Sequence, residues 1–366
     1  MTRTLGIHHI TSIVGHPQED LDYNAGIMAL RLVKQTLNYD DRDTMHLYYG
    51  NETASTGVTT TFPIMDAEDG ELGGGQVSRI QYGIKPGQSD YWAERLSRYK
   101  IASERSSLMD LHNLKFQDPT GLNIGLIETD LGPDNTWSFA GVEGEQAITG
   151  IHAATLLSEE PTETLIVLTD ILGYEVVEED DTYWKLNVHD DFGGILYLEK
   201  RRAPRGTMGK GTVHHIAFAI QDEDIDMWHE RLKAEGQHPT KIKDRHYFRS
   251  IYFREKGGIL IELATVGPGF TIDETEDQLG QQFIVPDTFK DDEAQILAEI
   301  MPLEVREIEE LSSYGYRNRE EYEIWKRRNE IRLKINEYSR AKDKRELTPE
   351  EREELARLRR EFINTK

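Results

Sequence analysis

Two pairs of adjacent histidines are the residues of this sequence whose type and setting could do chemistry. His8 and His9 lie in "GIHHITSIVG", and His214 and His215 lie in "GTVHHIAFAI", 206 residues further on. Imidazole is the commonest metal ligand among side chains and also carries protons near neutral pH. The 366-residue chain contains no cysteine, which excludes a thiolate metal site, a cysteine nucleophile and disulfides. Any metal must therefore be bound by imidazole and carboxylate, which suits iron, manganese or zinc.

An internal repeat places these histidines in equivalent settings. The stretch "VSRIQYGI" from Val77 matches "VHHIAFAI" from Val213, and weaker copies of the same opening begin at Gly6 and Gly150. Each opening is typical of a strand followed by a polar loop and a helix, and each unit ends on a strand entered through glycine. The repeat predicts four strand–helix–strands units built by duplication, rather than chance similarity among generic elements. The helix of the first unit is expected to include Ala25, Met28, Ala29 and Leu32.

Alignment of the four units separates structural positions from special ones, because a structural residue should recur in kind. At the position of His215 the other units carry His9, Arg79 and Ala153. At the position of Glu262 the other units carry Thr61, Gly125 and Leu198. Histidine is thus kept only in the first and fourth units, and only the fourth has a carboxylate.

Two imidazoles and one carboxylate are the ligand set of a facial triad, which leaves coordination positions open for substrate and dioxygen. Because side chains alternate along a strand, His215 and Glu262 can share one face while their apolar neighbours pack on the other. Each residue alone would more often be a core histidine or a solvated glutamate. Their joint pattern predicts that His9, His215 and Glu262 bind a metal. On ideal strands His8 and His214 face away from it, unless a local β-bulge turns them toward the site.

These motifs resemble the vicinal oxygen chelate superfamily of glyoxalase-like, bleomycin resistance and extradiol dioxygenase proteins, whose modules are βαβββ. More narrowly, "HHITSIVG", "VKQTLNYDD", "HLYYG", "DRHYFRSIYF" and "GGILIELAT" resemble the hydroquinone-type ring-cleaving dioxygenases over about residues 1–300. The resemblance implies an α+β fold of four βαβββ modules in two paired halves. Residues 1–145 are expected to form the N-terminal paired modules, and residues 146–305 the C-terminal paired modules with a closing segment.

The resemblance also implies roles for individual residues. In that family the iron is bound by the second histidine of each pair and by the late glutamate, which are His9, His215 and Glu262 here. Further catalytic residues of the family are matched in this sequence by His8, Thr11, His214, Arg245 and Tyr252. Catechol extradiol enzymes of the superfamily take both histidines from the last two modules, and this chain departs from them because Ala153 occupies the third-module position.

The function implied is an Fe(II)-dependent, extradiol-type ring-cleaving dioxygenase that acts on hydroquinone-like aromatic diols with O2. Mn(II) shares this ligand set and stays open as the metal. Two alternatives remain: a metal-dependent lyase or isomerase of the same superfamily, and a resistance protein that only binds a quinone or a drug. The ring substituents of the substrate cannot be read from the sequence.

Composition limits the partners and the location. The net charge of −24 argues against nucleic acid, no apolar run reaches the length of a membrane span, and the N-terminus lacks an apolar signal-peptide core. A cytoplasmic protein acting on a small aromatic substrate is expected. Oligomeric state is open, although paired-module proteins are often dimers or larger.

A change in charge marks a separate C-terminal segment. Residues 306–366 carry 17 Lys and Arg against 15 Asp and Glu, whereas residues 1–305 carry 26 against 52. Residues 319–341 suit one helix, and a second begins at "LTPEERE", with Thr348 as N-cap and Glu351 completing a capping box. The apolar stripes of the two helices are Ile324, Ile331, Ile335, Tyr338, Leu355, Leu358 and Phe362. This helical hairpin resembles a small uncharacterised bacterial family, which suggests a fusion, with a solvated surface or a docking role.

Overall fold

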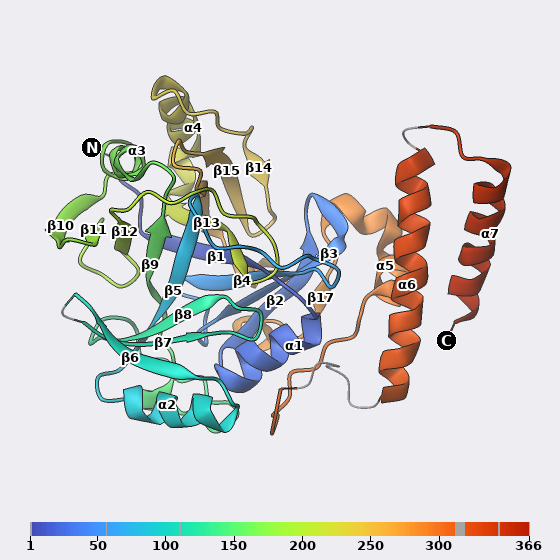
Figure 1. The fold of residues 1–366 in the computed structure, drawn as a ribbon, viewed down its shortest axis with the longest axis horizontal. Helices are drawn as coiled ribbons and strands as arrows, with labels where there is room; N and C mark the ends of the chain where they lie inside the picture. Colours follow the sequence, from blue (N-terminus) through green and yellow to red (C-terminus); the bar gives the residue numbers. More distant parts are fainter. Residues whose placement is uncertain (1, 56, 110, 312–318, 343–344, 366) are drawn as a thin grey trace. The chain divides into compact units, whose positions relative to one another are not determined.

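Four βαβββ modules follow one another along the chain, as the repeat predicts (Figure 1). The structure, a computed structural model, describes residues 2–55, 57–109, 111–311, 319–342 and 345–365. The first module consists of β1 (Ile7–Val14), α1 (Pro17–Leu21), β2 (Arg31–Asn38), β3 (Asp41–Gly50) and β4 (Val58–Pro63). The second consists of β5 (Gln76–Ile84), α2 (Ser89–Arg98), β6 (Ser103–Leu108), β7 (Leu111–Gln117) and β8 (Asn123–Glu128).

The third and fourth modules repeat this order. The third consists of β9 (Gly150–Leu157), α3 (Pro161–Ile166), β10 (Glu175–Glu179), β11 (Tyr183–Asn187) and β12 (Ile195–Glu199). The fourth consists of β13 (Thr212–Ile220), α4 (Ile225–Ala234), β14 (Lys243–Asp244), β15 (Phe248–Arg254) and β16 (Leu260–Pro268). A closing segment follows, with the short strand β17 (Phe283–Ile284) and helix α5 (Glu293–Glu299).

The helix of the first module is shorter than predicted. α1 continues as a π-helical turn over Asp22–Ile27, and the chain leaves the helix at Met28. Ala29 adopts a left-handed backbone conformation with a φ of 52°, which cannot continue a right-handed helix. Leu32 therefore lies in β2, and its predicted place in the helix is wrong. The apolar spacing was correct for a buried residue but did not distinguish helix from strand.

The modules assemble into two sheets in a non-sequential order. The nine-stranded sheet, called here the first sheet, has the order β14-β15-β16-β13-β1-β4-β3-β2-β17, and joins the first module to the fourth. The eight-stranded second sheet has the order β10-β11-β12-β9-β5-β8-β7-β6, and joins the second module to the third. Each sheet thus combines one module from residues 1–145 with one from residues 146–305, so the paired halves differ from those two predicted segments. The structure groups both segments in one compact unit, residues 1–298 with 303–311.

The two sheets meet through their central strands. β13 contacts β5, and β4 contacts β9, so the central strands of the two sheets lie close together. Ile10 and Ile216 of the first sheet are fully buried, as are Ile80 and Ala154 at the equivalent positions of the second. These apolar side chains alternate with the polar residues of the opposite face, as a half-buried strand requires. The alternation fixes which side chains face the site of the first sheet.

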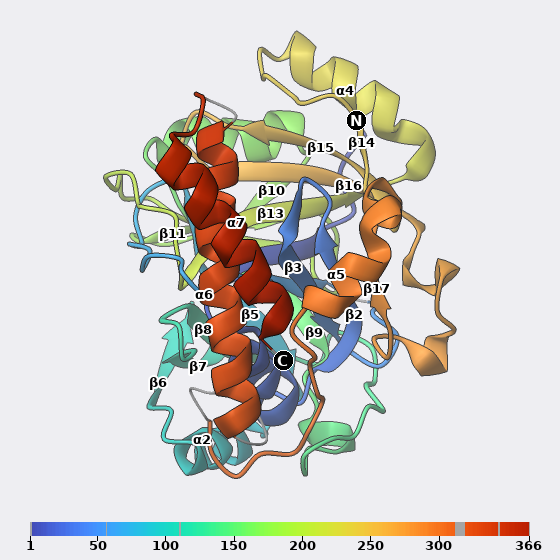
Figure 2. The same ribbon diagram turned by 90° about the vertical axis from the view of Figure 1, so that its right-hand side faces the viewer.

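The C-terminal unit contains the predicted helical hairpin. Helices α6 (Arg319–Lys342) and α7 (Pro349–Asn364) run side by side in both views (Figures 1 and 2). Thr348 caps α7 and forms the predicted capping box with Glu351. Residues 303–311 group with the first unit, where Arg306 pairs with the buried Asp22 at 2.6 Å, and residues 299–302 group with the second. The boundary at residue 306 stays a prediction. The fusion and any docking role of the hairpin stay predictions.

Within the described part of the chain, the helices are all too short or too polar to cross a membrane.

Candidate metal centre

The three predicted ligands come from three neighbouring strands in the middle of the first sheet. β1 pairs antiparallel with β13, and β13 pairs in parallel with β16. This order carries His9 on β1, His215 on β13 and Glu262 on β16. Although 206 residues separate the two histidines, they lie on adjacent strands because the first and fourth modules share a sheet.

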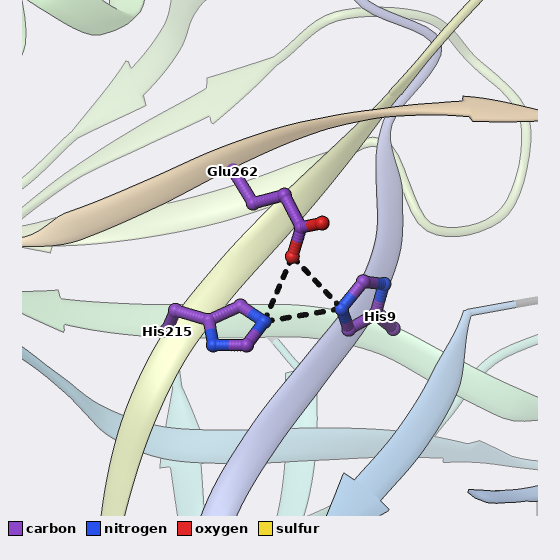
Figure 3. Close-up of side chains that lie close together, drawn as sticks. All are labelled: His9, His215 and Glu262. Atoms are coloured by element: carbon purple, nitrogen blue, oxygen red, sulfur yellow. Dashed lines mark hydrogen bonds and ion pairs between the residues drawn. The ribbon is translucent and has the colours of Figure 1, made fainter. Parts of the chain in front are cut away.

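The ligand atoms converge on one point (Figure 3). The Nε2 atoms of His9 and His215 lie 3.1 Å apart, and Oε2 of Glu262 lies 3.1 Å from the first and 2.9 Å from the second. The three residues are 2%, 4% and 0% exposed, respectively. Among the described residues, no other group of histidine and carboxylate side chains brings three ligand atoms this close together.

This triangle fits one face of a metal coordination sphere. Ligands at right angles on bonds of about 2.1 Å lie about 3.0 Å apart, which matches all three sides. Two buried imidazoles aimed at a carboxylate oxygen would otherwise compete for one acceptor. In addition, Oε1 of Glu262 is buried and has no hydrogen-bond partner among the described residues. A buried carboxylate oxygen without a donor is costly, and a cation relieves that cost. The residues present therefore fit a divalent metal.

The neighbouring histidines are turned toward the ligands by β-bulges. On β1 the two neighbours of His8 pair with consecutive residues of β13, and on β13 the two neighbours of His214 pair with consecutive residues of β1. Each of these histidines is therefore the extra residue of a bulge, which is the local irregularity that the sequence left open. The Nδ1 atoms of His8 and His9 lie 2.8 Å apart, and those of His214 and His215 also lie 2.8 Å apart.

These bonds allow Nε2 of each predicted ligand to be the free ring nitrogen. Burial, with a smaller contribution from His9, lowers the pKa of His8 to about 3, and burial with His215 lowers the pKa of His214 to about 3. Both rings are therefore neutral at pH 7 and can accept a hydrogen bond at Nδ1. A ligand that donates its Nδ1–H leaves Nε2 free to bind a metal, which is the usual arrangement around metal-ligating histidine.

The charge of the carboxylate is set by its neighbours. Burial alone would raise the pKa of Glu262, but His9 and His215 outweigh it and lower that pKa well below its usual value. Glu262 is therefore an anion over the physiological range. Because imidazole binds a metal in its neutral form, the three residues together would supply one negative charge to a bound metal.

Arg245 and Tyr252 lie beside the centre, as predicted. Tyr252 is the cross-strand partner of Glu262, and its ring centroid lies 5.6 Å from that of His215. Burial, followed by the charge of Glu262, raises the pKa of Tyr252 well above 10.0, so the hydroxyl keeps its proton. The Arg245 guanidinium lies 5.5 Å from the centroid of the Tyr252 ring and donates to Asp40 at 2.6 Å. A cation and a phenol thus line one side of the site, while their catalytic roles stay predictions.

Thr11 also reaches the centre, and it leads to residues that the sequence reasoning missed. Its Oγ1 atom lies 3.0 Å from Nε2 of His215, the ligand atom itself. Behind it lie three buried residues linked in a chain: Thr11 bonds to Thr60, Thr60 to His46, and His46 to Tyr48. The signal was present in "HLYYG", where His46 and Tyr48 are two residues apart and can share one face of a strand. A second missed residue is Phe248, whose ring packs against those of His8 and His9 at 5.0 and 5.4 Å.

Comparison with known proteins identifies relatives of this chain. A family model of the Glyoxalase/Bleomycin resistance protein/Dioxygenase superfamily matches residues 150–263. MhqO of Bacillus subtilis (strain 168), assigned as a ring-cleaving dioxygenase, is 41% identical over 309 residues, which cover 84% of this chain and 99% of MhqO. Chlorohydroquinone/hydroquinone 1,2-dioxygenase of Sphingobium indicum is 33% identical over 296 residues, covering 76% and 91% of the two chains. This structure superposes on the crystal structure of a Bacillus subtilis protein that is assigned as a dioxygenase, with a TM-score of 0.82 at 41% identity. The match covers 84% of this chain and all of that one.

Proposed function

This chain belongs to the glyoxalase, bleomycin resistance protein and dioxygenase superfamily, and within it to the family of MhqO, and on that premise we propose that it cleaves the ring of hydroquinone-like aromatic diols with O2. The observation that carries the proposal is the triangle of His9, His215 and Glu262, which leaves three coordination positions for substrate and dioxygen. The relative named as a chlorohydroquinone/hydroquinone 1,2-dioxygenase supports the substrate class.

We propose Fe(II) as the metal, held by the two Nε2 atoms and the glutamate, with Mn(II) as the other metal that suits these ligands. When bound, the iron supplies a Lewis acid that lowers the pKa of a phenol and a redox partner for dioxygen. Glu262 neutralises one of its two positive charges. The site therefore favours the monoanion of the substrate, which matches the remaining charge.

The residues around the triangle bind and orient the ring. A hydroquinone has its hydroxyls on opposite carbons, so a second group must hold the far hydroxyl. Arg245 and Tyr252 fit this role, because they offer a fixed cation and a protonated phenol beside His215. His214, which is neutral, is a further candidate for accepting a proton from the substrate. The reaction breaks a ring bond next to a hydroxyl-bearing carbon, and both oxygen atoms enter a ring-opened acid that also carries an aldehyde.

Oxygen uptake by anaerobically Fe(II)-loaded protein tests the function. A panel of substituted hydroquinones and catechols should show uptake of one O2 per hydroquinone ring, with a new absorbance from the opened ring. The variant Glu262→Gln keeps the size of the side chain but removes the charge, and it should show no uptake. Bound metal without uptake on any diol would contradict the proposal and favour the lyase or isomerase alternative. A Mn(II)-loaded sample separates the two metals. The expected cytoplasmic location and any homo-oligomer stay predictions.

A further inference from the structure

A chain of buried hydrogen bonds runs from the metal centre into the first sheet. Oγ1 of Thr11 lies 2.7 Å from Oγ1 of Thr60, which lies 2.9 Å from Nε2 of His46. Nδ1 of the same ring lies 2.9 Å from the hydroxyl of Tyr48. At the other end, Thr11 is 3.0 Å from the ligand atom of His215. All five residues are buried, so water does not compete for these bonds.

The direction of the hydrogens along this chain follows from counting donors. Burial lowers the pKa of His46 well below its usual value, so the ring is neutral and has a single N–H. In one direction, Tyr48 donates to Nδ1 of His46, Nε2–H of that ring donates to Thr60, and Thr60 donates to Thr11. In the reverse direction, Nδ1–H donates to Tyr48, and the hydrogen of Tyr48 is left without an acceptor among the described residues.

The first direction is favoured, because a buried O–H without an acceptor costs roughly 1–3 kcal/mol. This direction determines where the hydrogen of Thr11 points. Thr11 already accepts from Thr60, so its own hydrogen is directed away from Thr60 and toward the point where the ligand atoms converge. With a metal on Nε2 of His215, that nitrogen offers neither a hydrogen nor a lone pair to Thr11. The hydrogen of Thr11 is then available to an anionic oxygen in the site.

We propose that Tyr48, His46 and Thr60 are positioning residues that hold the hydroxyl of Thr11 as a hydrogen-bond donor to the phenolate oxygen of the substrate. This inference rests on the proposed ring-cleaving function, because it assumes that a phenol binds at the triangle. A donor fixed in this way stabilises the anion over the neutral phenol. A free threonine rotor could equally turn its lone pairs toward the substrate, which would favour the neutral form.

The test uses two pairs of neighbouring residues whose side chains point to opposite faces of their strands. Thr60→Val and Tyr48→Phe each remove one hydroxyl from the chain. The matched controls are Thr59→Val and Tyr49→Phe. In the wild-type protein, the hydroxyl of Thr59 bonds to another tyrosine at 2.5 Å, and the hydroxyl of Tyr49 donates to a buried aspartate at 2.9 Å. All four residues are at least nine-tenths buried, so the pairs are alike in burial and in the atoms removed.

The probe is nitrohydroquinone, a phenol whose absorbance shifts on ionisation, added without oxygen to the Fe(II)-loaded full-length protein. Three quantities are measured: the Kd for Fe(II), the Kd for the probe at pH 7, and the pH at which half of the bound probe is ionised. We expect Thr60→Val and Tyr48→Phe to raise the Kd of the probe about three- to tenfold and to raise the pH of half-ionisation, with Fe(II) binding unchanged.

Different results would overturn the inference and the proposed function. Wild-type affinity and half-ionisation in both chain variants would overturn the inference, as would equal shifts in the chain variants and their controls, which would indicate a general effect on packing. Failure of the wild-type protein to bind the probe would overturn the proposed function itself, and the inference with it. If Thr60→Val loses the metal, Tyr48→Phe carries the test, because it acts three hydrogen bonds away from Thr11.

Discussion

The two sheets of this protein share one scaffold, yet among the described residues only the first brings together side chains that could hold a metal ion. Both contain β-bulges at the same positions: His8 and His214 are the extra residues in the first sheet, and His152 and Ser78 are their counterparts in the second. The bulges therefore belong to the module and not to the metal site. What makes the first sheet a candidate metal centre is the residue that follows each bulge, together with one carboxylate.

At the positions of the two candidate histidine ligands, the second sheet has other residues. His152 occupies the position of His8 and is buried, but the residue after it is Ala153, and Nδ1 of His152 has no hydrogen-bond partner among the described residues. Arg79 stands where His215 stands, and its guanidinium donates to a backbone carbonyl. An imidazole partner thus turns a bulge histidine from a buried unpaired group into the support of a metal ligand.

The carboxylate position differs for a reason of space. Gly125 stands where Glu262 stands, and a Cβ atom added there would lie 2.8 Å from Oδ1 of Asn113. The corresponding residue of the first sheet is Ser250, as the strand registers show: Ser250 pairs with Ala264 and Asn113 with Ile127. A smaller neighbour leaves room for the glutamate. The carboxylate of the first sheet therefore depends on a residue that is not one of the three candidate ligands.

Removal of a candidate ligand from the first sheet should have the largest effect. His215→Ala or Glu262→Ala leaves two ligands, and bound metal should fall from one ion per chain to background after desalting. Arg79→Ala, at the position of His215 in the second sheet, is the matched control and should keep its metal. Elemental analysis of the purified proteins measures the effect. Unchanged metal content in His215→Ala or Glu262→Ala would refute the ligand assignment.

A smaller effect is expected from the bulge histidines, which support the ligands without binding the metal. His214→Ala removes the acceptor of the ligand N–H, and the metal affinity should fall about 10- to 100-fold. His152→Ala in the second sheet removes a bulge imidazole that has no candidate ligand beside it and should leave the affinity unchanged. Competition with a chromophoric chelator gives both values. Equal affinities in the two variants would mean that the bond between the Nδ1 atoms does not orient the ligand.

Exchange of Ser250 and Asn113 between the two sheets should have a still smaller effect. Ser250→Asn brings into the first sheet the side chain that closes the carboxylate position of the second. Crowding should displace Glu262 and lower the metal affinity about tenfold. The reciprocal variant, Asn113→Ser, changes a site without ligands and should not alter metal binding. Titration with Fe(II) compares the two, and full affinity in Ser250→Asn would show that size at this position is irrelevant.

Much of this site could be predicted from the sequence, because duplication supplies internal references. Four aligned copies single out His9, His215 and Glu262 without knowledge of the fold, and the capping residues predict the start of α7. These are local signals. The order of the strands is not local: periodicity shows that a strand is half-buried but not which strand lies beside it, so the pairing of the first module with the fourth was not foreseen.

The hydrogen-bonded chain behind Thr11 escaped prediction for the same reason. His46 and Thr60 meet only because β3 and β4 pair in one particular register, and a shift of one residue would turn either side chain to the other face. Leu32 was misplaced because its spacing suits a helix, whereas the conformation of Ala29 ends the helix before it. Register and backbone conformation are set by packing across the whole sheet.

The stability of the protein should depend on pH through His152 of the second sheet. Burial, with a smaller contribution from Lys185, lowers the pKa of His152 from 6.5 to about 4. The unfolded chain therefore takes up this proton at a higher pH than the folded protein does. The contribution of His152 to stability is complete above pH 6.5 and is lost as the pH falls toward 4. At pH 5 the loss is about 2 kcal/mol.

His152→Leu removes this titration and isolates its effect. Between pH 8 and pH 5, the free energy of unfolding in urea should fall by about 2 kcal/mol more in the wild-type protein than in the variant. Burial raises the pKa of Asp20 to about 7, which acts in the opposite direction, but it does so in both proteins and cancels in the difference. Equal falls would mean that His152 is protonated as readily in the folded protein as in the unfolded chain. The position of His8 offers no such isolated measurement, because its Nδ1 atom is bonded to a metal ligand, so the second sheet is where the energetics of a bulge histidine can be measured without the metal.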